Sequence, residues 1–249
     1  GREYQDNDTF KRLDNDIFTT KYCGKEIDLQ TYGMDDFPLS KYEVIDRGVD
    51  DDTKFKIRAK YGIPQNKIVF IYGGNLGKPQ GISFLIECLK TQEKNEEAFF
   101  LIVGDGTEFG KLETYFKEAK PTNMKLMKRL PKEDYDKMVG ACDVGMIFLD
   151  HRFTIPNFPS RLLAYMQARL PVLAVTDQNT DIGKVIVDGG FGWWCESNDR
   201  EKFIKEVRAA LQSDFHTARD KEFQYLLDYF TVDKAYEKIM SHFLKENGV

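Results

Sequence analysis

Long apolar runs and closely spaced cysteines are both missing from this 249-residue sequence. Without about 20 consecutive apolar residues, no membrane-spanning helix is expected. Cys23, Cys88, Cys142 and Cys195 lie far apart, so their spacing predicts neither a zinc site nor a disulfide framework. Basic residues are not in excess, and the net charge of −5 argues against nucleic acid as the main partner. Residues 1–8, GREYQDND, lack the pattern of a signal peptide, so we expect a reducing, cytoplasmic setting.

One stretch, IVFIYGGNLGKPQG at residues 68–81, organises the rest of the chain. Five apolar or aromatic residues run without alternation into Gly73 and Gly74, and Gly77 and Gly81 follow before an amphipathic segment. This order is typical of a buried parallel strand, a glycine turn and a helix. Glycine lets the backbone approach a ligand closely, and a helix start offers unpaired N–H groups and partial positive charge. A phosphate is the natural ligand of such a turn, and a purely structural role is the alternative.

From Lys54 onward, apolar runs alternate with amphipathic segments. Parallel neighbours in a sheet need helical crossovers, so this alternation predicts an α/β fold with a doubly wound, Rossmann-like sheet of six parallel strands. C-terminal helices are expected from Asp199 to Leu211 and from Phe215 to Leu244, with a break near Thr231. The expected strands span residues 68–72, 98–103, 124–131, 143–150, 171–176 and 190–195.

The first 53 residues differ from the rest in charge and pattern. They hold 14 acidic and 7 basic residues, a charge of −7, whereas the remainder carries +2. Short runs such as EIDLQTY could form strands, but much of this segment has the composition of loops. We therefore expect an irregular amino-terminal segment at residues 1–47, which is not a domain by itself, and a Rossmann-like domain at residues 48–249.

In open parallel sheets, ligands bind outside the carboxyl ends of the strands, where the strand order reverses. An NAD-linked enzyme is one alternative, with Asp105 as the acidic residue after the second strand. However, the glycines do not follow the G-x-G-x-x-G pattern, and Asp105 opens a loop between two glycines. The loops expected at the carboxyl edge are 73–81, 104–107, 128–131, 150–161 and 176–183.

Four segments in this order resemble one enzyme family. They are GGNLGKPQGISFLI, FLIVGDGTEFGKLE, RLPKEDYDKMVGACDVGMIFL and FPSRLLAYMQARLPVLA. Together they are similar to the carboxyl-terminal, nucleotide-sugar-binding half of glycosyltransferase family 4, whose members are retaining enzymes with the GT-B fold. The similarity covers residues 40–245, and RGVDDDTKF resembles the hinge that begins the second domain. Most of the acceptor-binding first domain would then be missing from this sequence.

The resemblance implies a donor site that needs no metal, because basic side chains and backbone N–H groups neutralise the diphosphate. Arg161 matches the basic residue at the family's helix start. Lys78 lies between the family's two cation positions and could reach the same phosphates, with a solvated surface lysine as the alternative, and we assign both cations catalytic roles. Arg161 lies in the first turn of its helix, where the dipole disfavours a cation, so an anionic ligand is expected there. Ser160 and Thr180 could also serve only as helix caps. The residues expected to bind the donor are Gly74, Asn75, Gly77, Gln80, Arg129, Leu130, Asp150, His151, Ser160, Thr180 and Asp181.

The sequence departs from the family at two pairs of positions. The family's arginine and lysine in the glycine turn fall at Asn75 and Gln80, so the usual cations are absent and only a neighbouring lysine remains. Two family glutamates, one near the sugar and one holding the ribose, fall at Pro156 and Ala164. Alanine cannot accept a hydrogen bond from ribose. Either another acceptor such as Asp150 or Asp181 replaces the glutamate, or the donor binds weakly.

We therefore predict a retaining, metal-independent glycosyltransferase, represented by its donor-binding half. It would transfer a sugar from a nucleotide sugar, UDP-linked, to a glycan or lipid-linked acceptor in surface-polysaccharide biosynthesis. The acceptor would bind through the missing domain, with peripheral association at the inner membrane surface. The alternative is a non-catalytic nucleotide-sugar-binding or partner-activating subunit that has lost both glutamates. The aromatic stripe at 215–230 is expected to form an interface.

Overall fold

The computed structural model describes residues 19–22, 25–28, 46–152 and 158–246. The chain forms two compact units, one of Ile45–Phe230 and one of Gly1–Val44 with Thr231–Val249. In the latter, strands β1 (Thr19–Tyr22) and β2 (Lys25–Asp28) pair antiparallel, and helix α9 spans Val232–Glu246. Most of the predicted amino-terminal segment lies outside the described residues, so its boundary at residue 47 stays a prediction.

The larger unit is built on a six-stranded, all-parallel sheet with the order β5-β4-β3-β6-β7-β8. The predicted fold class is therefore confirmed. The chain starts in the middle of the sheet, moves to one edge and then returns to build the other half, so the strand order reverses between β3 and β6. The strands are β3 (Ile68–Asn75), β4 (Ala98–Asp105), β5 (Met124–Met127), β6 (Val144–Phe148), β7 (Val172–Thr176) and β8 (Gly192–Glu196).

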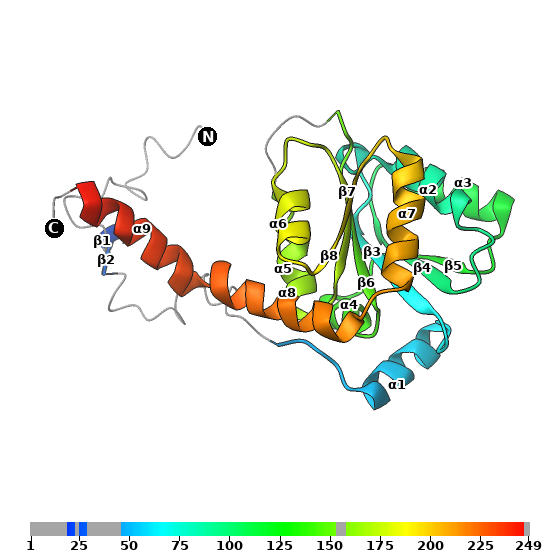
Figure 1. Ribbon diagram of the computed structural model, residues 1–249, viewed down its shortest axis with the longest axis horizontal. Coiled ribbons are helices and arrows are strands. Elements are labelled where there is room, and N and C mark those ends of the chain that lie inside the picture. Colours follow the sequence, from blue (N-terminus) through cyan, green and yellow to red (C-terminus); the bar gives the residue numbers. More distant parts are fainter. Residues whose placement is uncertain (1–18, 23–24, 29–45, 153–157, 247–249) are drawn as a thin grey trace. The chain divides into compact units, whose positions relative to one another are not determined.

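Helices cover both faces of this sheet (Figure 1). Helices α2, α3 and α7 lie on one side, and α5 and α6 lie on the other (Figure 1). The chain breaks near Thr231 as predicted, because α8 ends at Tyr229 and α9 begins at Val232. The helices of the larger unit are α1 (Asp51–Tyr61), α2 (Ile82–Thr91), α3 (Phe109–Ala119), α4 (Lys132–Gly140), α5 (Arg161–Gln167), α6 (Ile182–Asp188), α7 (Arg200–Leu211) and α8 (Phe215–Tyr229).

The double cover explains why the β3 sequence does not alternate between apolar and polar residues. Both faces of a doubly wound sheet are packed, so every side chain along a central strand is buried. Residues 69–72 have no exposed surface, and Phe70 stacks on Phe100 of β4 with ring centroids 5.0 Å apart. Each such side chain contributes about 1.5–3 kcal/mol on burial. The central strand is thus a rigid support for the turn that follows it.

A buried network of ion pairs lies at the amino ends of the central strands and holds helix α1 against them. The Asp143 carboxylate, just before β6, accepts hydrogen bonds from Arg58 of α1 at 2.6 Å and from the Val69 amide of β3 at 2.8 Å. Lys54 also donates to it at 2.6 Å. Burial alone would raise the pKa of Asp143, but Arg58 and Lys54 outweigh that effect and lower it. The carboxylate therefore stays charged and ties α1 to two strands.

Helix α8 contains a buried acid, Glu222, whose carboxylate is not paired by any described residue. Glu222 has no exposed surface, and neither of its carboxylate oxygens accepts a hydrogen bond from the described residues. Burial raises the pKa of Glu222 well above its usual value, and Arg219 offsets this only in part. The protonated form therefore fits the folded state, because an unpaired buried carboxylate is strongly disfavoured.

Replacing Glu222 should remove a pH-dependent loss of stability. A carboxyl group whose pKa is raised by folding stabilises the protein fully below its unfolded pKa, and this contribution falls as the pH rises toward the folded pKa. The Glu222→Gln variant should therefore gain stability relative to the native protein as the pH rises from 5 to 8, by up to about 1.4 kcal/mol per pH unit. Urea unfolding at several pH values measures this, with exposed Glu118→Gln as the control. A difference that does not change with pH would contradict it.

Candidate functional site

Arg161 begins helix α5 at the place where the strand order reverses. Its guanidinium lies over the ring of Tyr72, with Cζ 4.6 Å from the ring centroid. It also occupies the space beside Gly74, where an added Cβ would overlap its Nη2 atom. Gly74 has a φ of 116°, which side chains rarely adopt. Glycine is therefore needed at this position both for its backbone and for the room it leaves to Arg161.

The charge of Arg161 is not compensated within the described part of the chain. No carboxylate there forms an ion pair with it, and its neighbours are the neutral side chains of Tyr72, Tyr135 and Tyr165. Burial disfavours the charge of Arg161, but a guanidinium is not deprotonated in proteins, so Arg161 stays charged. A half-buried cation at a helix N-terminus is unfavourable unless an anion binds there.

Tyr135 of α4 covers Gly73, the residue before Gly74. A Cβ on Gly73 would overlap the Tyr135 phenol, so this glycine is also required by a side chain from another element. The buried Tyr135 hydroxyl has no hydrogen-bond partner among the described residues. Burial raises its pKa to about 12, although Arg161 acts in the opposite direction. The phenol therefore remains protonated at neutral pH.

A cavity of about 560 Å³ opens beside this pair of glycines, and we call it the rim cavity. It lies at the carboxyl ends of β3, β4 and β5, which is where a doubly wound sheet binds ligands. Arg129 is exposed there and makes no ion pair within the described residues. The lining residues are Gly74, Asn75, Val103, Gly104, Asp105, Arg129, Leu130, Lys132 and Tyr135.

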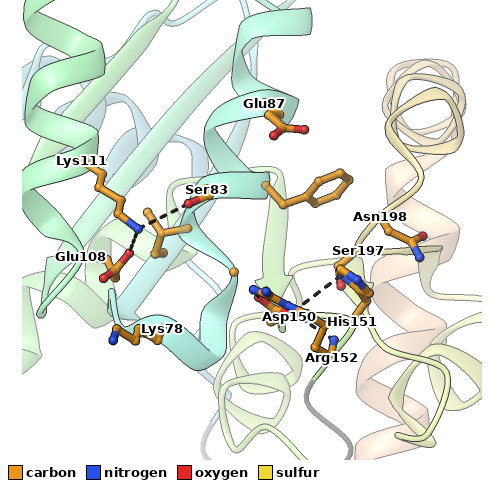
Figure 2. A pocket seen from close by; sticks show the side chains of 13 residues that line it. Lys78, Ser83, Glu87, Glu108, Lys111, Asp150, His151, Arg152, Ser197 and Asn198 are labelled. Carbon is orange, nitrogen blue, oxygen red and sulfur yellow. Dashed lines mark hydrogen bonds and ion pairs between the residues drawn. The ribbon is translucent and has the colours of Figure 1, made fainter.

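A second hollow of about 520 Å³, the polar pocket, holds other residues predicted for the same site (Figure 2). It contains Lys78 on one side and Asp150 and His151 on the other (Figure 2). Most of its charges are already paired, because Lys111 contacts Glu108, and Arg152 binds Asp150 at 2.7 Å. The structure thus places Lys78 in a different hollow from Gly74, Asn75, Arg129 and Leu130.

The glycine turn is closed by two amides where the family carries two cations. Asn75 Nδ2 donates to Gln80 Oε1 at 3.3 Å, and the same oxygen accepts the Gly77 amide at 3.1 Å. These bonds hold the turn together without any charge. Sequence reasoning noted the missing cations, but the mutual bond between their replacements depends on the folded turn.

The helix caps differ from the sequence expectation. Ser160 does precede α5, but it has helical backbone angles of −57° and −17° and its side chain makes no capping hydrogen bond. Thr180 does not cap α6, which begins at Ile182 after Asp181. The Asp177 carboxylate instead accepts the Asn179 and Thr180 amides at 2.7 and 3.0 Å. The Asp177 side chain thus closes the turn before α6, and the buried Thr180 hydroxyl has no hydrogen-bond partner among the described residues.

Of the two proposed replacements for the family glutamates, Asp150 is already engaged by a neighbouring arginine, whereas Asp181 is exposed. Asp150 accepts three hydrogen bonds from Arg152, and this contact lowers the pKa of Asp150 to about 2. Asp181 is exposed at the start of α6. Ala164 lies half-buried in α5, and Pro156 lies outside the described residues. Within the described ranges, no three carboxylate, histidine or cysteine side chains gather into a metal site.

Two aromatic residues at this site were missed from the sequence. In the sequence, Tyr72 is recognisable only as the last residue of a buried strand, and Tyr135 only as one residue of a short helix. The double glycine 73–74 was a usable signal, because two consecutive residues without side chains at a strand end leave room for side chains from elsewhere.

No described helix is both long and apolar enough to cross a membrane. Among curated relatives, a probable glycosyltransferase, WbjE, from Pseudomonas aeruginosa is 31% identical over 135 residues, which cover 54% of this chain and 34% of the relative. A putative colanic acid biosynthesis glycosyl transferase, WcaI, from Escherichia coli K12 is 23% identical over 76% of this chain and 45% of its own. The chain thus spans less than half the length of these two relatives.

The solved structure of Anabaena HepE in complex with UDP and glucose has the same fold over 80% of this chain and 54% of its own, with a TM-score of 0.64 and 16% identity. The profile of the family described as glycosyl transferases group 1 matches residues 53–224. The resemblance seen in the sequence is therefore confirmed, and the NAD-linked alternative gains no support. Because the match spans well over half of the chain and includes the glycine turn, the rim cavity and α5, this chain belongs to the group 1 glycosyl transferase family.

Proposed function

We propose that this chain is the donor-binding half of a retaining, metal-independent glycosyltransferase that uses a UDP-linked sugar. The product would be a surface polysaccharide, built on a glycan or lipid-linked acceptor at the cytoplasmic side of the inner membrane. Family membership supports sugar transfer, and the HepE structure, with the same fold, contains UDP and glucose. The name of WcaI refers to colanic acid biosynthesis, which supports the polysaccharide role.

The uncompensated charge of Arg161 carries this proposal. The guanidinium lies at the reversal of strand order, over a glycine, at the start of a helix, and without an acidic partner among the described residues. Each of these features favours an anionic ligand. A phosphate group of the donor fits this position, because a guanidinium can bind two phosphate oxygens at once.

The rim cavity would then hold the nucleoside beside this phosphate. Leu130 offers an apolar surface for the base, and the exposed Arg129 adds positive charge. The departing diphosphate gains negative charge as the sugar bond breaks, so a fixed cation stabilises that charge more than it stabilises the bound donor. Lys78 is exposed on the glycine turn, and its flexible side chain would reach the phosphates only by leaving the polar pocket.

The second candidate is a non-catalytic subunit that binds the nucleotide sugar without turning it over. Ala164 and the neutral amide pair of Asn75 and Gln80 favour this candidate, since they remove a ribose acceptor and two cations. Binding of the donor is common to both candidates. Only turnover separates them.

Removing the charge of Arg161 should weaken binding of the diphosphate but not of the nucleoside. A hydrogen bond to a charged group contributes about 1.5–3 kcal/mol, so Arg161→Gln should raise the Kd for UDP roughly 10- to 100-fold. Binding of uridine should change little, because uridine has no phosphate. Isothermal titration calorimetry with UDP and uridine measures both values.

Arg208→Gln is the matched control, because Arg208 is an exposed arginine on α7. It should bind UDP as the native chain does. Equal UDP affinity in Arg161→Gln and the native chain would contradict the role of Arg161. Failure of the native chain to bind UDP, together with tight binding of GDP or ADP, would change the proposed donor.

Turnover should distinguish the enzyme from the subunit. For an enzyme, the complete protein, with its acceptor-binding half present, should release UDP from UDP-glucose or UDP-N-acetylglucosamine, and both Lys78→Ala and Arg161→Ala should lose this activity. The larger loss is expected for Arg161, because its position is fixed by packing whereas Lys78 is exposed. UDP-sugar binding without release of UDP, in the presence of glycan acceptors, would support the subunit instead.

A further inference from the structure

Tyr72 makes contacts that join Arg161 to the glycine turn. Its side chain is fully buried, and its ring lies beneath the Arg161 guanidinium, 4.6 Å from Cζ. Its hydroxyl donates a hydrogen bond to the Asn75 carbonyl at 2.9 Å. The ring also packs edge-on against Phe148 of β6, with centroids 6.0 Å apart. One rigid side chain therefore touches the cation, the turn and the neighbouring strand.

An arginine side chain has many rotamers and needs a partner to hold it in one position. The face of an aromatic ring carries negative charge from its quadrupole, so it attracts a guanidinium placed over it. For Arg161 this face belongs to Tyr72, and Gly74 leaves the space above the strand free. Among the described residues, the guanidinium is thus held in place by an aromatic ring and not by a carboxylate.

Arg58, another arginine of this chain, shows how a guanidinium is held by a carboxylate instead of an aromatic ring. Arg58 is 2% exposed and pairs with the Asp143 carboxylate at 2.6 Å. That pairing neutralises its charge, and its remaining donors bind backbone carbonyls. Arg58 therefore has nothing left to offer a ligand. An aromatic partner, in contrast, fixes the position of a guanidinium and leaves its charge and its hydrogen-bond donors available.

The geometry points to Tyr72 as the positioning residue of the anion site. Its ring holds Arg161 over Gly74, and its hydroxyl holds the turn on which the anion would rest. The identity of the anion, the diphosphate of a sugar donor, rests on the function proposed above, but the positioning of Arg161 for a phosphate oxyanion does not. Tyr72 acts through Arg161, so its contribution should disappear when Arg161 is removed.

The test compares fluorinated phenylalanines at position 72 with Tyr72→Phe, so that all of these variants lack the hydroxyl and differ mainly in the charge distribution of the ring. Tyr72→Phe keeps an aromatic face, and a series with one, two, three and five fluorines at position 72 weakens that face step by step with little change in shape. Inorganic pyrophosphate is the probe, measured by calorimetry. Tyr72→Phe should bind it within about threefold of the native chain, and affinity should fall along the series to roughly tenfold weaker.

The same series in an Arg161→Gln background separates positioning from a general structural effect. If Tyr72 acts through Arg161, fluorination should cause no further loss there, because coupled residues are not additive. Pentafluorophenylalanine at Phe203, a buried residue that contacts Phe148, is the control for fluorine in the core and should leave binding unchanged. Thermal unfolding of each variant shows which members of the series fold.

Three results would overturn the inference. The folded members of the series could bind pyrophosphate equally well, the loss could persist when Arg161 is absent, or the native chain could fail to bind pyrophosphate. Native binding of pyrophosphate without binding of UDP, GDP or ADP would remove the proposed donor function and leave the inference standing. If pentafluorophenylalanine prevents folding at position 72, the trend over the mono- and difluorinated variants decides.

Discussion

The site depends on one charge that the described chain does not neutralise. Arg161 lies where the strand order reverses, because the crossover after β6 turns away from the crossover after β3 and leaves the carboxyl ends of both strands uncovered. Helix α5 begins beside that gap and adds its dipole to the guanidinium. The bare strand end at residues 73–74 then makes room for Arg161 on one glycine and Tyr135 on the other. The reversal of strand order, the start of α5 and the two glycines thus all lie around the Arg161 guanidinium.

Charged side chains are held differently at the amino ends and at the carboxyl ends of the strands. At the amino edge, Asp143 is satisfied by Arg58, Lys54 and a backbone amide, so that edge ties α1 to the sheet. At the carboxyl ends of the strands, Arg161 lies over the Tyr72 ring, next to Gly74, which lines the rim cavity. The charges before the strands are thus paired, whereas the guanidinium at the carboxyl ends is held in place by an aromatic ring without an acidic partner among the described residues.

Because the glycine turn lacks two of the family's cations, Arg161 supplies a larger share of the positive charge near this turn. Asn75 and Gln80 bind each other, so the turn keeps its shape after losing two cations. Lys78, the one lysine left on the turn, lies in the polar pocket and not beside the rim cavity. A donor diphosphate would consequently depend on fewer positive charges here, and the residues that hold Arg161 in place become correspondingly more important.

The order of strands and helices followed from the sequence, because local periodicity and the need for crossovers between parallel strands leave few alternatives. The first turn of α5 and the glycine pair were also visible there, since both are local patterns. The sequence could not show that Lys78 and Arg129 line different hollows, that Asp177 closes the turn before α6, or that Tyr72 lies under Arg161. Those facts are set by contacts between residues far apart in the chain, and the direction of a side chain is decided only when its neighbours pack around it.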